Sequence, residues 1–135
     1  MEKQVERTFL EGSERQKLRA YSPAVITRGG KTVWLAGHGP GASLIEPPLA
    51  GDFVAQTHAC FSRLKETLER AGGSLDDIVT MTVFITDARY GTPFTEIRQG
   101  YFPKGFPASA LITVAGLAQP QMLVEIQGIA VIPDA

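Results

Sequence analysis

Glu125 is the most informative candidate for chemistry, because this carboxylate lies within the apolar segment LVEIQGIAV at residues 123–131. Side chains alternate between the two faces of an extended strand, so Glu125 shares one face with Gln127. Two interpretations stay open. Either this face contacts water, as most carboxylates in strands do, or Glu125 orients a water molecule or acts as a general acid or base.

Two histidines are further candidates. His38 lies in the segment GHGPG at residues 37–41, just after a predicted strand. It is either a functional side chain or a loop histidine bonded to the backbone. His58 falls within a predicted helix and is interpreted as structural or exposed. The two histidines lack the spacing of a metal-binding pair, so neither a metal nor another cofactor is expected.

The glycine-rich segment at residues 37–41 does not have the features of a phosphate-binding loop. It lacks the full G-x-G-x-x-G pattern and the Gly-Lys-Ser/Thr ending, and Pro40 removes a backbone donor. The only cysteine, Cys60, falls on the apolar face of a predicted helix, which favours an inert core thiol over a nucleophile. A single cysteine also excludes an internal disulfide.

Two helices are predicted to support these residues. The first begins after Asp52, whose side chain can cap it, and ends at Gly72-Gly73. Apolar residues recur along it at intervals of three and four, at Phe53, Cys60, Phe61, Leu64, Leu68 and Ala71. A second helix is expected to open at Thr92-Pro93, and the residues between Gly41 and Gly51 are expected to form an irregular loop.

Five strands are predicted from β-branched and alternating residues, at Ala24–Thr27, Lys31–Ala36, Ile78–Thr86, Ser109–Val114 and Leu123–Ile132. Gly29-Gly30 indicates a hairpin between the first two strands, and a second hairpin is expected at the C-terminal end. The order ββ-α-β-α-ββ predicts an α+β fold, with a mixed β-sheet and two helices packed on one face.

The chain is long enough for one domain. It has 135 residues, of which 44% are hydrophobic and 20% are charged, as in an ordinary globular protein. Nine charged residues fall within residues 1–20, so these are interpreted as a charged N-terminal extension, with a further short strand at Val5–Leu10, before a single domain at residues 21–135.

The charge balance limits the partners. The chain has 13 Lys and Arg against 14 Asp and Glu. It therefore lacks the net positive charge that attracts a nucleic acid or an anionic membrane. No apolar run reaches the length of a membrane-spanning helix or a signal peptide. The sequence therefore predicts a cytoplasmic protein without nucleic-acid or membrane partners.

Five segments together resemble the Rid (YjgF-type) reactive-intermediate deaminase family, also described as endoribonuclease L-PSP-like. They are YSPAV at residues 21–25, LAGHGP at 35–40, AGGSLDDIVTMTVFITD at 71–87, GYFPKGFPA at 100–108 and LVEIQGIAVI at 123–132. The resemblance implies a chorismate-mutase-like fold and a homotrimer, with a cleft at each subunit interface. Two copies would then build each site.

The resemblance also implies roles for individual residues. Glu125 matches the glutamate that orients the attacking water, whereas Ser109 stands where family members carry the arginine that clamps the substrate carboxylate, and Leu111 replaces a frequent cysteine. The substrate-binding positions that carry over are Tyr21, Gly37, His38, Thr95, Ser109 and Ala110. A serine gives one neutral hydrogen bond instead of a bidentate charged contact.

Without that arginine, the pocket is expected to be less cationic than in deaminating members. Either the substrate is neutral or bulkier, or another cation takes over, the choices being Arg28, Arg89, Arg98 and protonated His38. The leading hypothesis is a Rid-like hydrolase (2-iminobutanoate/2-iminopropanoate-deaminase-like) acting on a small metabolite with a C=N or enamine group. The alternatives are a non-catalytic metabolite-binding protein and, with less support from the charge, an RNA-acting protein.

Overall fold

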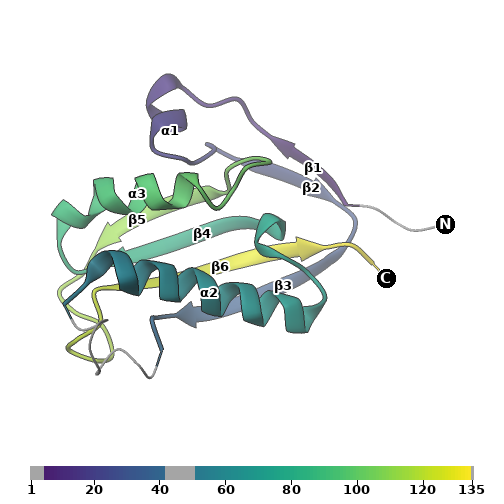
Figure 1. Ribbon diagram of the computed structural model, residues 1–135. Helices are drawn as coiled ribbons and strands as arrows, with labels where there is room; N and C mark the ends of the chain where they lie inside the picture. The colour runs from purple at the N-terminus through teal and green to yellow at the C-terminus, as the bar shows by residue number, and fades with distance from the viewer. Residues whose placement is uncertain (1–4, 42–50, 135) are drawn as a thin grey trace.

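The computed structural model describes residues 5–41 and 51–134, so most of the loop expected between Gly41 and Gly51 lies outside the described residues. Helices and strands occupy β1 Glu6–Phe9, α1 Glu14–Leu18, β2 Val25–Arg28, β3 Lys31–His38, α2 Phe53–Ala71, β4 Ile78–Ile85, α3 Gly91–Gln99, β5 Ala108–Thr113 and β6 Val124–Ile132. Short 3₁₀ turns lie at Leu75–Asp77 and Ala88–Tyr90. In Figure 1, α2 and α3 lie on the same face of the larger sheet. The predicted α+β fold is confirmed.

The larger sheet has the strand order β3-β6-β4-β5. β6 is antiparallel to both β3 and β4, whereas β5 runs parallel to β4 and leaves its other side as a sheet edge. Along β6, Val124, Ile126 and Ala130 are buried under the helices, whereas Glu125 and Gln127 lie on the other face. The alternation predicted for this strand is confirmed, and Glu125 lies on the face away from the helices.

Both predicted hairpins are wrong. β2 pairs with β1, while β3 pairs with β6, so the chain leaves one sheet and enters another at Gly29-Gly30. Both glycines have φ of +81°, as a tight turn requires. At the other end β5 pairs with β4 and not with β6. A Gly-Gly pair determines only where the chain turns, and it does not determine which strands pair. The apolar strand β6 buries most surface when it lies between two other strands, and this burial determines the strand pairing.

The long helix α2 matches its prediction. Asp52 Oδ1 accepts a hydrogen bond from the Ala55 amide at 3.0 Å, and Gly72 ends the helix with a left-handed φ of +92°. Cys60 is fully buried, and this burial raises the pKa of its thiol to about 12, as expected for an inert core cysteine. Among the described residues, no helix has the length and apolar character needed to cross a membrane.

The second helix, α3, begins at Gly91 rather than after Thr92. It continues directly from the 3₁₀ turn at Ala88–Tyr90, and its N-cap residue Tyr90 makes no side-chain capping hydrogen bond. Thr95 Oγ1 donates to the Thr92 carbonyl at 2.9 Å inside the helix. The stripe that packs on the core is the predicted one around Phe94, which is fully buried.

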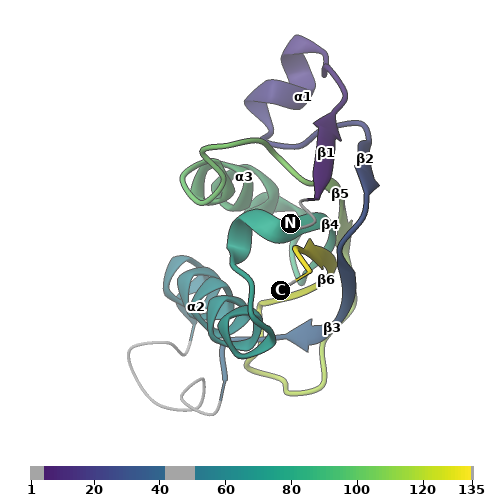
Figure 2. The same ribbon diagram turned by 90° about the vertical axis from the view of Figure 1, so that its right-hand side faces the viewer.

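The N-terminal segment packs on the rest of the chain. β1 pairs with β2, and Arg7 Nη2 donates to the Val131 carbonyl at 2.8 Å. The ring of Phe9 lies so close to Gly105 that a Cβ there would come within 2.5 Å of it. Figures 1 and 2 show α1 beyond β5, on the side of α3. The segment therefore delivers side chains from α1 to the open edge of the larger sheet.

Candidate functional site

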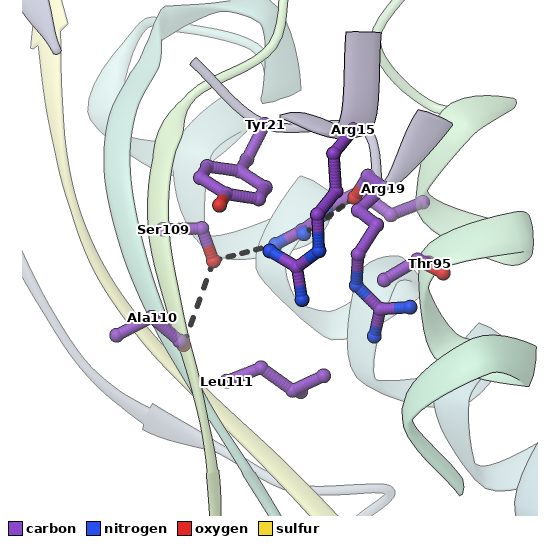
Figure 3. Close-up of a pocket in the computed structure, with 8 residues that line it drawn as sticks. Arg15, Arg19, Tyr21, Thr95, Ser109, Ala110 and Leu111 are labelled. Atoms are coloured by element: carbon purple, nitrogen blue, oxygen red, sulfur yellow. Dashed lines mark hydrogen bonds between the residues drawn. The ribbon is translucent and has the colours of Figure 1, made fainter. Parts of the chain in front are cut away.

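A pocket of about 400 Å³ lies at the β5 edge of the larger sheet. It is enclosed by β5, α3 and the segment around α1, and it is lined by Arg15, Arg19, Tyr21, Thr95, Arg98, Ser109, Ala110 and Leu111. Figure 3 shows the side chains of Arg15 and Arg19 extending into the space between Ser109 and Thr95. Four of the six predicted substrate-binding residues, Tyr21, Thr95, Ser109 and Ala110, thus line one pocket.

Strand register explains how β5 lines this pocket. Ser109 pairs with Met81, a buried core residue, so its side chain projects toward the helices. Ala110 pairs with Thr82 and points to the opposite face. On α3, Thr95 and Arg98 are three residues apart and therefore lie on one face of the helix. This face of α3 is turned toward Ser109.

Arg98 is the central side chain of the pocket wall and is only 1% exposed. Its Nη1 donates to Ser109 Oγ at 2.5 Å and its Nη2 donates to the Arg19 carbonyl at 3.0 Å. The guanidinium carbon lies 5.1 Å from the centroid of the Phe94 ring. The buried Nε has no hydrogen-bond partner among the described residues. Packing and hydrogen bonds thus hold this guanidinium beside Ser109.

The environment of Arg98 is unfavourable for its charge. Burial is the largest cause that lowers its pKa, the nearby charge of Arg19 adds to the lowering, and together they bring the pKa to about 10. A guanidinium with this pKa still carries its charge at neutral pH. The site therefore contains a buried cation with no acidic partner in the part of the chain that the structure describes.

Two more arginines make the pocket more cationic than expected. Arg15 is exposed and Arg19 is half-buried. Within residues 5–41 and 51–134, neither guanidinium has a hydrogen bond or an ion pair, and no carboxylate lines the pocket. The sequence did not point to these two residues, since a charged N-terminal segment has the composition of a solvated surface.

The structure also selects among the four cations that the sequence left open. Arg98 reaches Ser109, whereas Arg89 is bound to Asp87 at 2.6 Å and Arg28 lies 3.8 Å from Glu6. A guanidinium therefore stands beside Ser109 after all, but it comes from α3 rather than from β5.

Gly37 and Glu125 lie together, away from the pocket. Glu125 pairs with Phe84 of β4, and β4 separates β6 from β5. A Cβ added at Gly37 would lie 2.9 Å from the carboxyl carbon of Glu125. This pair occupies the sheet face opposite to the helices and to Ser109.

His38 is separate from both groups. Its Nδ1 lies 2.7 Å from the Ala36 carbonyl, and its Nε2 lies 2.8 Å from Thr67 Oγ1 on α2. Both ring nitrogens therefore have partners within the chain, and His38 is the last residue of β3. His58 has a different partner, since its Nδ1 lies 2.6 Å from the Tyr101 hydroxyl. No group of three potential ligands that could hold a metal occurs among the described residues.

Known proteins share both this sequence pattern and this fold. The family model described as Endoribonuclease L-PSP matches residues 12–132. A RutC family protein from Pyrococcus horikoshii is 31% identical over 110 residues, which cover 82% of this chain and 85% of that protein. A RutC family protein from Pyrococcus abyssi is 32% identical over 114 residues, with coverage of 82% and 84%.

Solved structures agree. RidA from an Antarctic Psychrobacter superposes with a TM-score of 0.68 at 33% identity, covering 83% of this chain and 88% of that one. The Rid-family protein YyfB from Yersinia pestis, described as of unknown function, gives a TM-score of 0.82 at 24% identity, covering 96% and 100%, and shows a shared fold. The chain belongs to the endoribonuclease L-PSP family, as a protein of the Rid (YjgF) type.

Proposed function

We propose that this protein hydrolyses a small carboxylated imine, or the enamine that tautomerises to it, to a carbonyl compound and ammonia. Water adds its oxygen to the C=N carbon, the nitrogen takes up protons, and the C–N bond then breaks. The observation that carries this proposal is the buried Arg98 guanidinium beside Ser109 in a pocket without a carboxylate. Such a cation is suited to hold a substrate carboxylate.

In this proposal Arg98 binds the substrate carboxylate, the role of the β5 arginine in other family members. Ser109 holds the Arg98 side chain in position. A guanidinium has five N–H donors, and protein acceptors in the described chain engage Nη1 and Nη2 once each. N–H groups therefore remain for a substrate carboxylate. Ser109 Oγ accepts from Arg98 and fixes its direction, so Ser109 acts as a positioning residue.

The water-orienting carboxylate comes, in our proposal, from a second copy of the chain. Glu125 does not line the pocket of its own chain, and it lies on a sheet face with large exposed apolar residues. Trp34 on this face is 75% exposed and Ile112 is 42% exposed. A shallow hollow of about 240 Å³ beside Trp34 is lined by residues of β3, β4 and β6. Covering such a face favours association, and a homotrimer would let a partner's Glu125 reach the pocket.

A non-catalytic metabolite-binding protein is the second candidate. It is favoured by one observation: among the described residues of a single chain, the titratable side chains that line the pocket are arginines and one tyrosine. RNA cleavage, which the family description names, has less support, because the net charge is −1. Salt-sensitive binding to single-stranded RNA would favour the RNA function.

Ammonia release separates the hydrolase from the binding protein. Imines are generated in the cuvette by an amino-acid oxidase, and ammonia is followed with and without the protein. We expect the protein to accelerate ammonia release from carboxylated imines. Tight binding of the corresponding keto acid with no acceleration on any imine would establish the binding protein instead.

Gly37→Ala is expected to slow hydrolysis at least tenfold while the protein stays folded. The new Cβ would lie 2.9 Å from the Glu125 carboxyl carbon, so the carboxylate has to move. A misplacement of about 1 Å at a group that takes part in the reaction can cost about a hundredfold in rate. Imine hydrolysis and thermal unfolding are measured in parallel.

Gly116→Ala is the matched control, because a Cβ there meets nothing within 4 Å. We expect this variant to keep the wild-type rate. An equally fast Gly37→Ala protein would show that the present position of Glu125 is irrelevant to turnover.

A further inference from the structure

The pocket holds more positive charge than one carboxylate needs. A single substrate carboxylate is satisfied by one guanidinium, and Arg98 is already positioned for it. Arg15 and Arg19 add two more guanidiniums, and no carboxylate of the described chain lines the pocket to balance them. This excess charge has no structural role in the contacts of the described residues.

The second cationic group, Arg15 and Arg19, is separate from Arg98 in origin and in environment. Both residues come from the segment of α1, and their spacing of four places them on one side of it. Like charges at this spacing repel each other, so the arrangement costs stability unless an anion lies between them. Arg19 also repels Arg98: burial is the main cause of the lowered pKa of Arg98, and the charge of Arg19 lowers it further.

The backbone beside these arginines is held in an unusual conformation. Ala20 has a φ of +61° and is fully buried, although it is not a glycine. A left-handed conformation costs such a residue about 1 kcal/mol and persists only where its surroundings enforce it. It follows Arg19 directly and precedes Tyr21, both of which line the pocket. The turn therefore keeps Arg19, Tyr21 and the Arg98 contact with the Arg19 carbonyl in a fixed relation.

We infer that the site takes a small dicarboxylate, whose first carboxylate binds Arg98 and whose second binds Arg15 and Arg19. The inference rests on the proposed function for the reacting C=N group, and it adds the substrate class: imines of acidic amino acids. A pocket of about 400 Å³ has room for a chain of four or five carbons with both carboxylates. An imine derived from an amino acid with a neutral side chain would leave Arg15 and Arg19 without an anionic partner.

The test compares two ligands that differ only in charge. Glutarate and its monoamide have nearly the same shape, so their dissociation constants, measured by calorimetry at low ionic strength, report the second anionic contact alone. We expect wild-type protein to bind glutarate at least tenfold more tightly than the monoamide. This preference is expected to shrink as salt is added, because Arg15 is exposed.

The Arg15→Gln/Arg19→Gln double variant is expected to bind both ligands within about threefold of each other. The Arg28→Gln/Arg70→Gln double variant removes the same charge from exposed positions outside the pocket and is expected to keep the preference. Equal binding of the two ligands to the wild type, or a preference that survives in the Arg15/Arg19 variant, would overturn the inference.

Turnover distinguishes this inference from the proposed function. The imines of glutamate and glutamine are formed by oxidases, and their rates of hydrolysis are compared at imine concentrations below KM. We expect the glutamate-derived imine to react at least tenfold faster. Equal rates would overturn the inference and leave the hydrolase intact. Preferential glutarate binding with no turnover of any imine would support the dicarboxylate site and contradict the proposed hydrolase.

Discussion

Glu125→Gln is expected to reduce imine hydrolysis by about 10²- to 10⁴-fold, the range that a general acid or base contributes. Glutamine has almost the same shape as glutamate, but its amide cannot accept a proton from water at neutral pH. Glu125 lies outside the Arg98 pocket of its own chain. In our proposal a partner's Glu125 reaches this pocket, where its negative charge repels a dianion, so we expect glutarate to bind the variant at least as tightly as it binds the wild type.

The matched control for this variant is Glu96→Gln. Glu96 is an exposed carboxylate on α3 that does not line the pocket, so its replacement makes the same change in net charge. Hydrolysis by the control is expected at the wild-type rate. If the Glu125→Gln protein also keeps its full rate, Glu125 has no part in the reaction.

Arg98→Met is the second large effect. A hydrogen bond to a charged group is worth about 1.5–3 kcal/mol, so we expect kcat/KM for carboxylated imines to fall by about 10- to 150-fold. The loss is expected mainly in KM, because the substrate carboxylate is bound equally before and during the reaction. Steady-state kinetics over a wide range of substrate concentration separate KM from kcat. Arg70→Met, on the exposed side of α2, is the control.

The stability of the Arg98→Met protein provides an independent check. The variant loses the hydrogen bonds to Ser109 Oγ and the Arg19 carbonyl, but it also removes a buried charge that no carboxylate neutralises. Folding lowers the pKa of Arg98 from its ordinary value to about 10, so the cost of its charge is present in full below pH 10 and declines only above it. The contribution of Arg98 ionisation to the stability difference between variant and wild type is therefore expected to be constant from pH 6 to 9. A large drift in that range would mean that other groups are coupled to Arg98.

Local patterns in the sequence predicted α2, α3 and the strands well, but they did not predict the short helix α1. Asp52 and Gly72 act through the nearest turn of α2, and the alternation around Glu125 follows from strand geometry alone. Strand partners were not predictable in the same way. Gly29-Gly30 indicated a turn correctly, but the burial of β6 between β3 and β4 depends on contacts far apart in the sequence.

The candidate site was predicted only in part, because it too depends on contacts between residues far apart in the sequence. The resemblance identified Tyr21, Thr95, Ser109 and Ala110, which the fold gathers into one pocket. The contact between Arg98 and Ser109 joins a helix to a strand, and the sequence offered Arg98 only as one of four cations. Arg15 and Arg19 gave no signal at all, because their place depends on how the N-terminal segment packs.

Subunit mixing tests most directly whether two copies share each site. The Glu125→Gln and Arg98→Met proteins are unfolded together in equal amounts, refolded, and assayed on a carboxylated imine at a concentration well below KM, where each variant alone is expected to keep no more than about a tenth of the wild-type activity. If a site combines Glu125 of one chain with Arg98 of another, random assembly leaves about one site in four with both intact residues. We predict that about a quarter of the wild-type activity returns in the mixture. A mixture no more active than the separate variants would contradict the shared site.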